Sequence, residues 1–374
     1  MSLERHCLDT RPPTFAAEMI KGEGHNYNKA VAIWLFIGVG MLIVQVLLGG
    51  ITRLTGSGLS ITEWNVVTGV LPPMNERQWV AEFKKYTHTD QFRYLNFEFT
   101  LSNFKFIFFW EWFHRLWGRL IGFAFVIPFI IFLKRQRLKP EMVKPLIILF
   151  LLGGLQAVVG WVMVKSGLTG DAIYVAPTQL AIHFILALTL VCYTFWFALQ
   201  LSITGEKKLH NSSLNKFTCL ILVLLGIQLM FGSLMAGHKA ASAAYTWPDI
   251  NGSLMPRNMF AGGLINFISN KITIHFVHRN LGYFIFILIL IWTVKAYRIR
   301  SPFFNKVKWI PMLLVLLQVM LGILSVVTSI QIIPNHWGRF EWFAQFHQLV
   351  AMFLLLSLVL MLFLVRKSAK QTAS

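Results

Sequence analysis

Long uninterrupted runs of apolar residues recur along this chain of 374 residues. An α-helix rises about 1.5 Å per residue, so roughly 20 apolar residues are needed to cross the hydrocarbon layer of a bilayer. Eight runs reach that length: 31–50, 106–133, 146–164, 178–203, 217–237, 272–294, 309–328 and 343–365. Membrane β-barrel strands instead alternate apolar and polar residues over about ten positions. We therefore expect an all-α polytopic membrane protein with eight transmembrane helices.

Composition and charge placement agree with this expectation. Only 13% of the residues are charged, against about 25% in soluble proteins. Most of the 34 Lys and Arg residues lie in the two tails and in the loops after the second, fourth and sixth runs. By the positive-inside rule these segments, and both termini, are cytoplasmic or on the matrix side. The net charge of +19 therefore reflects topology, and we do not expect nucleic-acid binding.

The ends and the cysteines indicate the compartment. Residues 1–30 lack the apolar core of a signal peptide and contain four acidic residues, whereas mitochondrial presequences are poor in acids. We expect a bacterial cytoplasmic (inner) membrane, with the mitochondrial inner membrane as the alternative. No two of Cys7, Cys192 and Cys219 share an outer loop, so no structural disulfide is expected.

An internal repeat organises the chain. Each odd-numbered run contains Gln-x-x-x-Gly, and each even-numbered run has a histidine near its predicted outer end. The pairs are Gln45/Gly49, Gln156/Gly160, Gln228/Gly232 and Gln318/Gly322, and the histidines are His114, His183, His278 and His347. His114 and His278 are 164 residues apart, as are His183 and His347. The chain is thus predicted to be a duplicated four-helix unit.

The repeat predicts the domain boundaries. Two four-helix halves, 31–203 and 217–366, are joined by a cytoplasmic linker, 204–216, and flanked by cytoplasmic tails, 1–30 and 367–374. Each half crosses the membrane an even number of times, so the halves are expected to be two bundles related by a pseudo-twofold axis along the membrane normal. All four histidines then lie at similar depth on the outer side. We expect the Gln-x-x-x-Gly pairs to serve helix packing.

The four histidines predict heme. A single intramembrane histidine is often a packing residue, but four at one depth in duplicated pairs indicate ligands. Two imidazoles from facing helices of a four-helix unit are a usual axial ligand set for heme iron. We therefore predict one heme site in each half.

The residues after two of these histidines suit a porphyrin. His114 and His278 both begin a His-Arg-x-x-Gly motif. The glycine, one turn from the histidine, is expected to leave space for a flat macrocycle. Arg115 and Arg279 lie where propionates would emerge, and Arg pairs well with carboxylates. The alternative for these residues and for Arg119 is that they reach to lipid headgroups.

The two halves differ three residues before these histidines. Glu111 precedes His114, whereas His275 precedes His278. A carboxylate beside one site suggests that this site does chemistry while the other holds a cofactor; the alternative is a merely solvated carboxylate. His275 is open to three roles: ligand, proton relay or propionate partner. The last two are favoured because His278 carries the repeated spacing.

Several motifs resemble one known family. They are Gly49-Gly-Ile-Thr-Arg-Leu-Thr-Gly-Ser-Gly-Leu-Ser followed by Trp64, Glu111-Trp-Phe-His-Arg-Leu-Trp-Gly-Arg, Leu234-Met-Ala-Gly-His-Lys-Ala, and His347-Gln. Together they resemble the heme A synthases over nearly the whole chain. That family has an eight-helix duplicated fold and oxidises the C8 methyl of heme O to the formyl group of heme A, the cofactor of terminal oxidases. No cysteine pair stands in the first outer loop, so the chain is similar to the mitochondrial and alphaproteobacterial group.

The resemblance implies roles for the site residues. His114 and His183 would hold the iron of the substrate, heme O, with Glu111 needed for activity. His278 and His347 would hold the iron of a heme B cofactor. The expected mechanism is two successive hydroxylations to a gem-diol, which loses water to give the aldehyde. Glu111 would move protons or stabilise developing positive charge.

The implied partners are the lipid bilayer, an unidentified electron donor or acceptor, a heme O synthase (a farnesyltransferase) and oxidase assembly factors. A homo-oligomer is left open. Two other classes were weighed. A diheme b-type cytochrome in quinol electron transfer would place its hemes on opposite sides of the membrane. A repeat-built transporter would have helices broken near the midplane. The first outer loop, 51–105, has an amphipathic stretch around Trp79, Phe83 and Tyr86 that either caps the substrate site or lies on the bilayer surface.

Overall fold

A computed structural model describes residues 15–64, 68–203, 208–257, 259, 261–333 and 336–366, and the regular structure in this part is helical. The predicted tail 1–30 and linker 204–216 lie partly outside the described residues, and the tail 367–374 lies wholly outside them.

Eight helices of the described part are long and apolar enough to span a membrane. They are α1 (Phe15–Leu54), α4 (Leu101–Lys134), α5 (Pro140–Ser166), α6 (Pro177–Ser202), α7 (Ser212–Gly237), α9 (Lys271–Tyr297), α11 (Ile310–Thr328) and α12 (Arg339–Val365). Each coincides with one predicted run, which confirms the fold class. The large apolar side chains of Phe123, Val158, Val223 and Leu313 are more than half exposed, as contact with lipid requires.

Several helices begin earlier than hydropathy predicts, and for α4 and α5 the reason is local. α4 begins at Leu101 because Thr100 and Asn103 form a reciprocal capping box. Its first turn contains the polar Ser102 and Asn103, which hydropathy excludes. α5 begins with Pro140 in its first turn, where a missing backbone N–H costs little.

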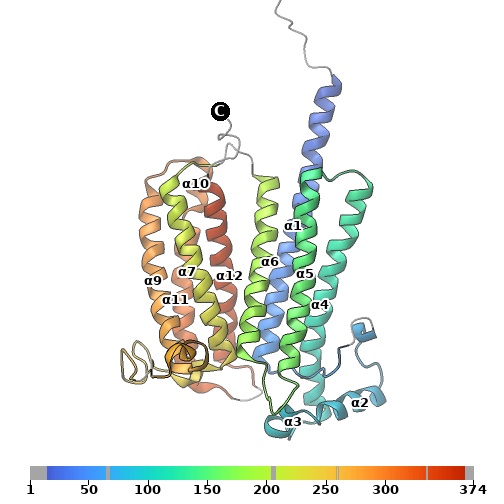
Figure 1. Ribbon diagram of the computed structural model, residues 1–374, viewed down its shortest axis with the longest axis vertical. Coiled ribbons are helices and arrows are strands. Elements are labelled where there is room, and N and C mark those ends of the chain that lie inside the picture. Colours follow the sequence, from blue (N-terminus) through green and yellow to red (C-terminus); the bar gives the residue numbers. More distant parts are fainter. Residues whose placement is uncertain are drawn as a thin grey trace, which may run out of the picture.

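The helices form two adjacent bundles (Figure 1). α1, α4, α5 and α6 make one bundle, and α7, α9, α11 and α12 make the other. The bundles meet where α6 contacts α7 and α12 and where α1 contacts α12. The first described helix begins, and α12 ends, at the upper end of the view. Helix order is the same in both bundles, as a duplicated unit predicts; the pseudo-twofold axis stays a prediction.

The long loop after α1 packs against α4. It contains α2 (Glu76–Tyr86) and α3 (Asp90–Leu95), which begin after the side-chain caps Asn75 and Thr89. Tyr86 is fully buried with Phe104, and its hydroxyl donates to Gln91 at 3.0 Å. Burial raises the pKa of Tyr86 to about 12. The apolar face of the predicted amphipathic stretch is therefore covered by protein.

The remaining described helices are short. They are the α-helices α8 (Asn266–Ser269) and α10 (Pro302–Val307) and the 3₁₀ turns η1 (Thr68–Val70), η3 (Ala240–Ala243), η4 (Gly263–Ile265) and η5 (Ser329–Gln331). η3 contacts α7, α9 and α11, so the α7–α9 loop folds back over the ends of its own bundle. Each bundle thus has a loop that covers the same end of its helices (Figure 1).

Candidate functional site

A cavity of about 1170 Å³ extends between the helices of both bundles. Its volume exceeds the roughly 300–1,000 Å³ of common small-molecule sites. The lining includes the four predicted histidines, His114, His183, His278 and His347, and the four repeated glutamines, Gln45, Gln156, Gln228 and Gln318. All four histidines therefore face one continuous space.

Each glutamine contacts the histidine of a neighbouring helix. Gln45 Nε2 lies 3.3 Å from both ring nitrogens of His114 and donates to its carbonyl at 3.2 Å. Gln156 Nε2 repeats this on His183, at 3.2 Å from the ring nitrogens and 3.1 Å from the carbonyl. The same pattern is thus made by α1 on α4 and by α5 on α6.

The second bundle makes related contacts. Gln228 Nε2 donates to the carbonyl of His278 at 2.9 Å. Gln318 Nε2 lies 3.1 Å from His347 Nε2. The backbone carbonyl of Gln318 accepts a hydrogen bond from His347 Nδ1 at 3.0 Å. The glutamines therefore position the histidines in both bundles.

The glycine four residues after each glutamine makes room for the imidazole. A Cβ at Gly49, Gly160, Gly232 or Gly322 would lie 3.3, 2.8, 3.1 or 3.0 Å from Cε1 of His114, His183, His278 or His347, respectively. Contacts this short are rarely tolerated. The expectation that Gln-x-x-x-Gly serves helix packing holds, because each pair contacts a neighbouring helix, but the residue received there is a histidine. The motif is a seat for an imidazole, in which the amide contacts the ring and the glycine admits it.

Gly118 and Gly282, the glycines of the His-Arg-x-x-Gly motifs, are expected to leave space for a porphyrin, but each lies next to a glutamine. A Cβ at Gly118 would lie 3.5 Å from Gln45 Nε2, and a Cβ at Gly282 would lie 3.2 Å from Gln228 Nε2. These glycines therefore admit the glutamine amide of the adjacent helix. They line the cavity as well, but their first effect is on the position of the glutamine.

The two histidine pairs suit an iron whose remaining ligands are supplied by a porphyrin. The rings of His278 and His347 are 6.3 Å apart between centroids and inclined by 74°. Imidazole nitrogens bind metals such as zinc at about 2.0–2.1 Å, so one metal ion can lie between two rings at this separation. His114 and His183 are close enough to interact electrostatically. Within the described part, no cluster of three or more His, Cys, Asp or Glu side chains is arranged to hold a metal. Two imidazoles alone suit heme, whose porphyrin supplies the other ligands.

Glu111 is fixed beside the first pair. Its carboxylate is buried, and Oε2 accepts hydrogen bonds from Ser60 Oγ at 2.7 Å and from the Ile61 backbone N–H at 2.9 Å. Arg115 Nη2 donates to Oε1 at 2.5 Å. Arg115 also donates to the carbonyls of Ile61 and Glu63. The loop after α1 therefore holds this carboxylate in one orientation at the cavity wall.

The corresponding residues of the second bundle are arranged differently. His275 is fully buried next to the Ala241 carbonyl, yet neither ring nitrogen makes a full hydrogen bond with a described residue. Arg279 donates to the carbonyls of Asp249 and Ala244, both at 2.7 Å. Arg115 and Arg279 thus bind carbonyls of the loops after α1 and α7, which disfavours the alternative that they reach to lipid headgroups. Whether either also meets a propionate stays a prediction.

Comparison of the sequence with known proteins identifies the family to which the chain is similar. The family model COX15-CtaA, described as cytochrome oxidase assembly protein, matches residues 32–359. Similar curated proteins include the heme A synthase of Beijerinckia indica, 39% identical over 361 residues, which cover 93% of this chain and 95% of that protein. The heme A synthase of Bradyrhizobium diazoefficiens is 39% identical over 81% of the chain and 85% of its own length. That of Paracoccus denitrificans is 36% identical over 85% and 86%.

Proposed function

Because the chain belongs to the COX15-CtaA family of cytochrome oxidase assembly proteins, we infer that it is a heme A synthase, the oxidoreductase that converts heme O to heme A. Membership confirms the family predicted from the sequence motifs. The observation that carries the functional assignment is that two histidine pairs line one cavity, with the carboxylate of Glu111 fixed three residues before His114, where the second bundle has His275.

We propose that the two sites divide the work. His114 and His183 bind the iron of heme O in the N-terminal half, and His278 and His347 bind a resident heme B in the C-terminal half. The imidazole seats support binding at both sites. Glu111, which has no carboxylate counterpart before His278, supports chemistry at the first site alone.

When bound, the hemes supply the electron transfer and oxidation that the methyl carbon requires. The contribution of this chain is positional. The glutamine seats orient the imidazoles, and the loop after α1 covers the cavity near Glu111, where Leu59 and Trp64 line the wall. Oxidation of a methyl group to an aldehyde releases protons from the reacting carbon. Glu111 is held to accept such a proton or to stabilise positive charge at that carbon, and Arg115 keeps its carboxylate from turning away.

We further propose the orientation in the membrane. The basic loops after α4, α6 and α9, the start of α1 and the end of α12 share one side, which by the positive-inside rule is cytoplasmic. The histidine sites then face the periplasm of a bacterial inner membrane. An electron partner, a heme O synthase and assembly factors would meet the protein from this membrane.

The rival diheme cytochrome is disfavoured by the cavity. Such a protein would carry its hemes on opposite sides of the membrane, whereas all four histidines here line one space.

Single-site variants test the division of labour. His183→Ala is expected to lose bound heme O while retaining heme B, and His347→Ala is expected to lose heme B. Chromatography of hemes extracted from each purified variant measures both. Loss of the same heme from both variants would contradict the assignment of substrate and cofactor to separate halves.

A further inference from the structure

Two of the helix pairs that join the bundles, α6–α7 and α1–α12, form seams of different character. At the α6–α7 seam the contacts are apolar. Ala181 packs with Phe231 and Leu234, and a Cβ at Gly237 would lie 2.8 Å from Pro177 Cα. Close packing of small and apolar side chains is sufficient to hold helices together in a membrane.

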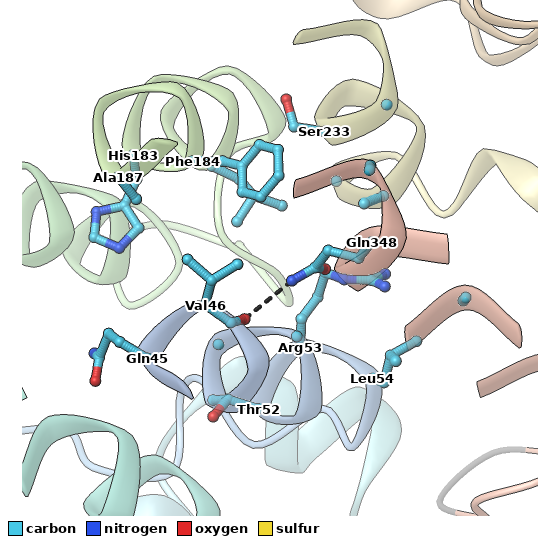
Figure 2. Close-up of a pocket in the computed structure, with 18 of the residues that line it drawn as sticks. Gln45, Val46, Thr52, Arg53, Leu54, His183, Phe184, Ala187, Ser233 and Gln348 are labelled. Carbon is cyan, nitrogen blue, oxygen red and sulfur yellow. Dashed lines mark hydrogen bonds between the residues drawn. The ribbon is translucent and has the colours of Figure 1, made fainter. Parts of the chain in front are cut away.

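The α1–α12 seam is polar. Gln348 Nε2 donates to the Val46 carbonyl at 3.0 Å (Figure 2), and Gln345 Nε2 donates to the Leu47 carbonyl at 3.2 Å. A Cβ at Gly50 would meet the amide of Gln345, so a larger residue there would displace this side chain. Polar side chains thus follow the face of α12 that packs on α1.

A third polar residue extends this face of α12. Glu341 lies four residues before Gln345, on the same side of the helix, and is buried. At the repeat spacing of 164 positions, α6 carries Pro177, Ala181 and Phe184 where α12 carries Glu341, Gln345 and Gln348. The polar character of the α1–α12 seam is therefore not required by the fold, because the related seam does without it.

Arg53 lies at the end of the polar seam. It stands two turns beyond Val46 on α1, lines the cavity, and points toward α12 beside Gln348 (Figure 2). Glu341 is near enough to act on it electrostatically, and no ion pair between the two is found among the described residues. In the described part of the chain, no residue accepts a hydrogen bond from the Arg53 guanidinium. Its five N–H donors therefore face the cavity without a protein acceptor.

Arg53 is unusual among the residues at the corresponding position of the four imidazole seats. The position eight residues after each glutamine lines the cavity in all four helices, and it is occupied by Arg53, Val164, Ala236 and Val326. Eight residues place it about 12 Å along the helix from the glutamine. Three of the four residues are apolar, so the position does not demand a charge. An unpaired guanidinium within the membrane is costly and indicates a ligand.

Further positive charge gathers at the same place. Lys239, two residues after α7 ends, lies with its ammonium 3.6 Å from the centre of the Tyr174 ring. Burial, together with the charges of Arg53 and Lys271, lowers the pKa of Lys239 to about 8. Burial is the main cause of this shift, and the neighbouring cations Arg53 and Lys271 add to it.

Arg115 and Arg279, the arginines that follow His114 and His278, already donate to protein acceptors and have few donors left for a ligand. Arg115 is engaged by Glu111 and two loop carbonyls, and Arg279 is engaged by two more. Arg53 is the cavity cation whose fork is uncommitted among the described residues, and it points toward α12, the helix that carries His347.

We propose that Arg53 binds a propionate carboxylate of the heme held by His278 and His347, so that the N-terminal bundle completes the cofactor site of the C-terminal bundle. A guanidinium can bind a carboxylate through two parallel hydrogen bonds. The polar contacts of Gln345 and Gln348 fix α1 against α12 and so fix the reach of Arg53. This inference rests on the proposed function, because it requires a heme at the second histidine pair.

Blocking the propionates tests the proposal. Full-length protein carrying His183→Ala, with or without Arg53→Gln, is titrated with hemin and with hemin dimethyl ester. With Arg53 present, hemin is expected to bind about tenfold or more tightly than the ester, because charged hydrogen bonds are worth about 1.5–3 kcal/mol. With Arg53→Gln, the two ligands should bind equally. Arg53→Lys, which keeps the charge without the fork, should retain part of the preference.

Matched variants make the result specific. Arg93→Gln removes an exposed arginine that pairs with Asp90 in the outer loop, and it should leave the preference unchanged. In a His347→Ala background, Arg53→Gln should not alter the preference. An unchanged preference in the His183→Ala background, or an effect confined to the His347→Ala background, would overturn the proposal. Failure of the His183→Ala protein to bind either porphyrin would instead contradict the proposed heme sites, and the inference with them.

Discussion

In the N-terminal bundle, the side chain three residues before the α4 histidine is Glu111, and its carboxylate accepts three hydrogen bonds that fix it at the cavity wall. In the C-terminal bundle, the matching side chain is His275, which is buried without a full hydrogen bond to a described residue. The seats of the ligands are alike in both bundles, since a glutamine and a glycine receive each imidazole.

This difference shows which residues stay the same in the two halves of the duplication and which differ. Residues that hold the histidines are retained in both bundles, as the proposed binding of a heme by each pair requires. Residues around the histidines differ, as the proposed division into a substrate site and a cofactor site requires. The comparison therefore predicts which substitutions affect chemistry and which affect binding.

The largest expected effect is that of Glu111→Gln, which breaks the asymmetry. Heme A formation should fall by about 10²–10⁴-fold, the usual contribution of a positioned acid or base, while heme B stays bound. His275→Gln is the matched variant of the other bundle, and its activity should remain within about tenfold of the parent. Heme A in extracts of cells that make heme O measures both. Equal losses in the two variants would contradict the proposed specialisation of the halves.

The seats should be equally sensitive in both bundles. Gly160→Ala places a methyl group 2.8 Å from the His183 ring, and Gly322→Ala places one 3.0 Å from the His347 ring. Each should weaken binding of its own heme by about 10- to 100-fold, as overpacking of a fixed site does. Gly154→Ala is the control, since a Cβ there has no atom within 4 Å among its described neighbours. Absorbance of purified protein gives the occupancy, and a Gly160→Ala protein with full occupancy would show that the seat is not selective.

A smaller effect should separate the two arginines. Arg115→Lys keeps a charge but loses the fork that binds Glu111 and two carbonyls. Heme A formation should fall by about fivefold to tenfold with both hemes retained. Arg279→Lys should instead loosen the loop that contains Asp249, with heme B released faster and the rate per bound heme B maintained. The interpretation fails if the two variants have the same phenotype.

The smallest expected effect concerns Lys239. Its pKa of about 8 lies below the usual lysine value of 10.5 because the side chain is buried near other cations. Between these values the unfolded chain binds more protons than the folded one, so the stability of heme-free protein should rise with pH across this window. Lys239→Met should lack the rise. Apparent Tm between pH 7.5 and 10 checks this, and a parallel pH dependence in both proteins would contradict the assigned cause.

The spans and the histidines could be predicted from the sequence, because both depend on local patterns. Eight apolar runs define eight helices, and repeat spacing alone brings His114 and His278 to notice. The role of the glutamine–glycine pairs was missed, since helix packing and an imidazole seat have the same spacing along one helix. The sequence did contain a signal for this role, because the pair occurs four times and the helices that follow carry four histidines.

Contacts between distant segments could not be predicted. Arg115 and Arg279 bind carbonyls of loops that fold back over the bundles, and no local pattern specifies such a return. Arg53 was read only as part of a family motif, because its neighbours on α12 lie some 290 residues further along the chain.

Identification of the extracted hemes tests the central claim most directly. The protein is purified from cells that also make heme O, and its hemes are separated by chromatography with mass detection. The account predicts heme B together with heme O, its hydroxylated form or heme A. Heme B alone, at about two per chain, would contradict it, because both histidine pairs would then hold the same cofactor.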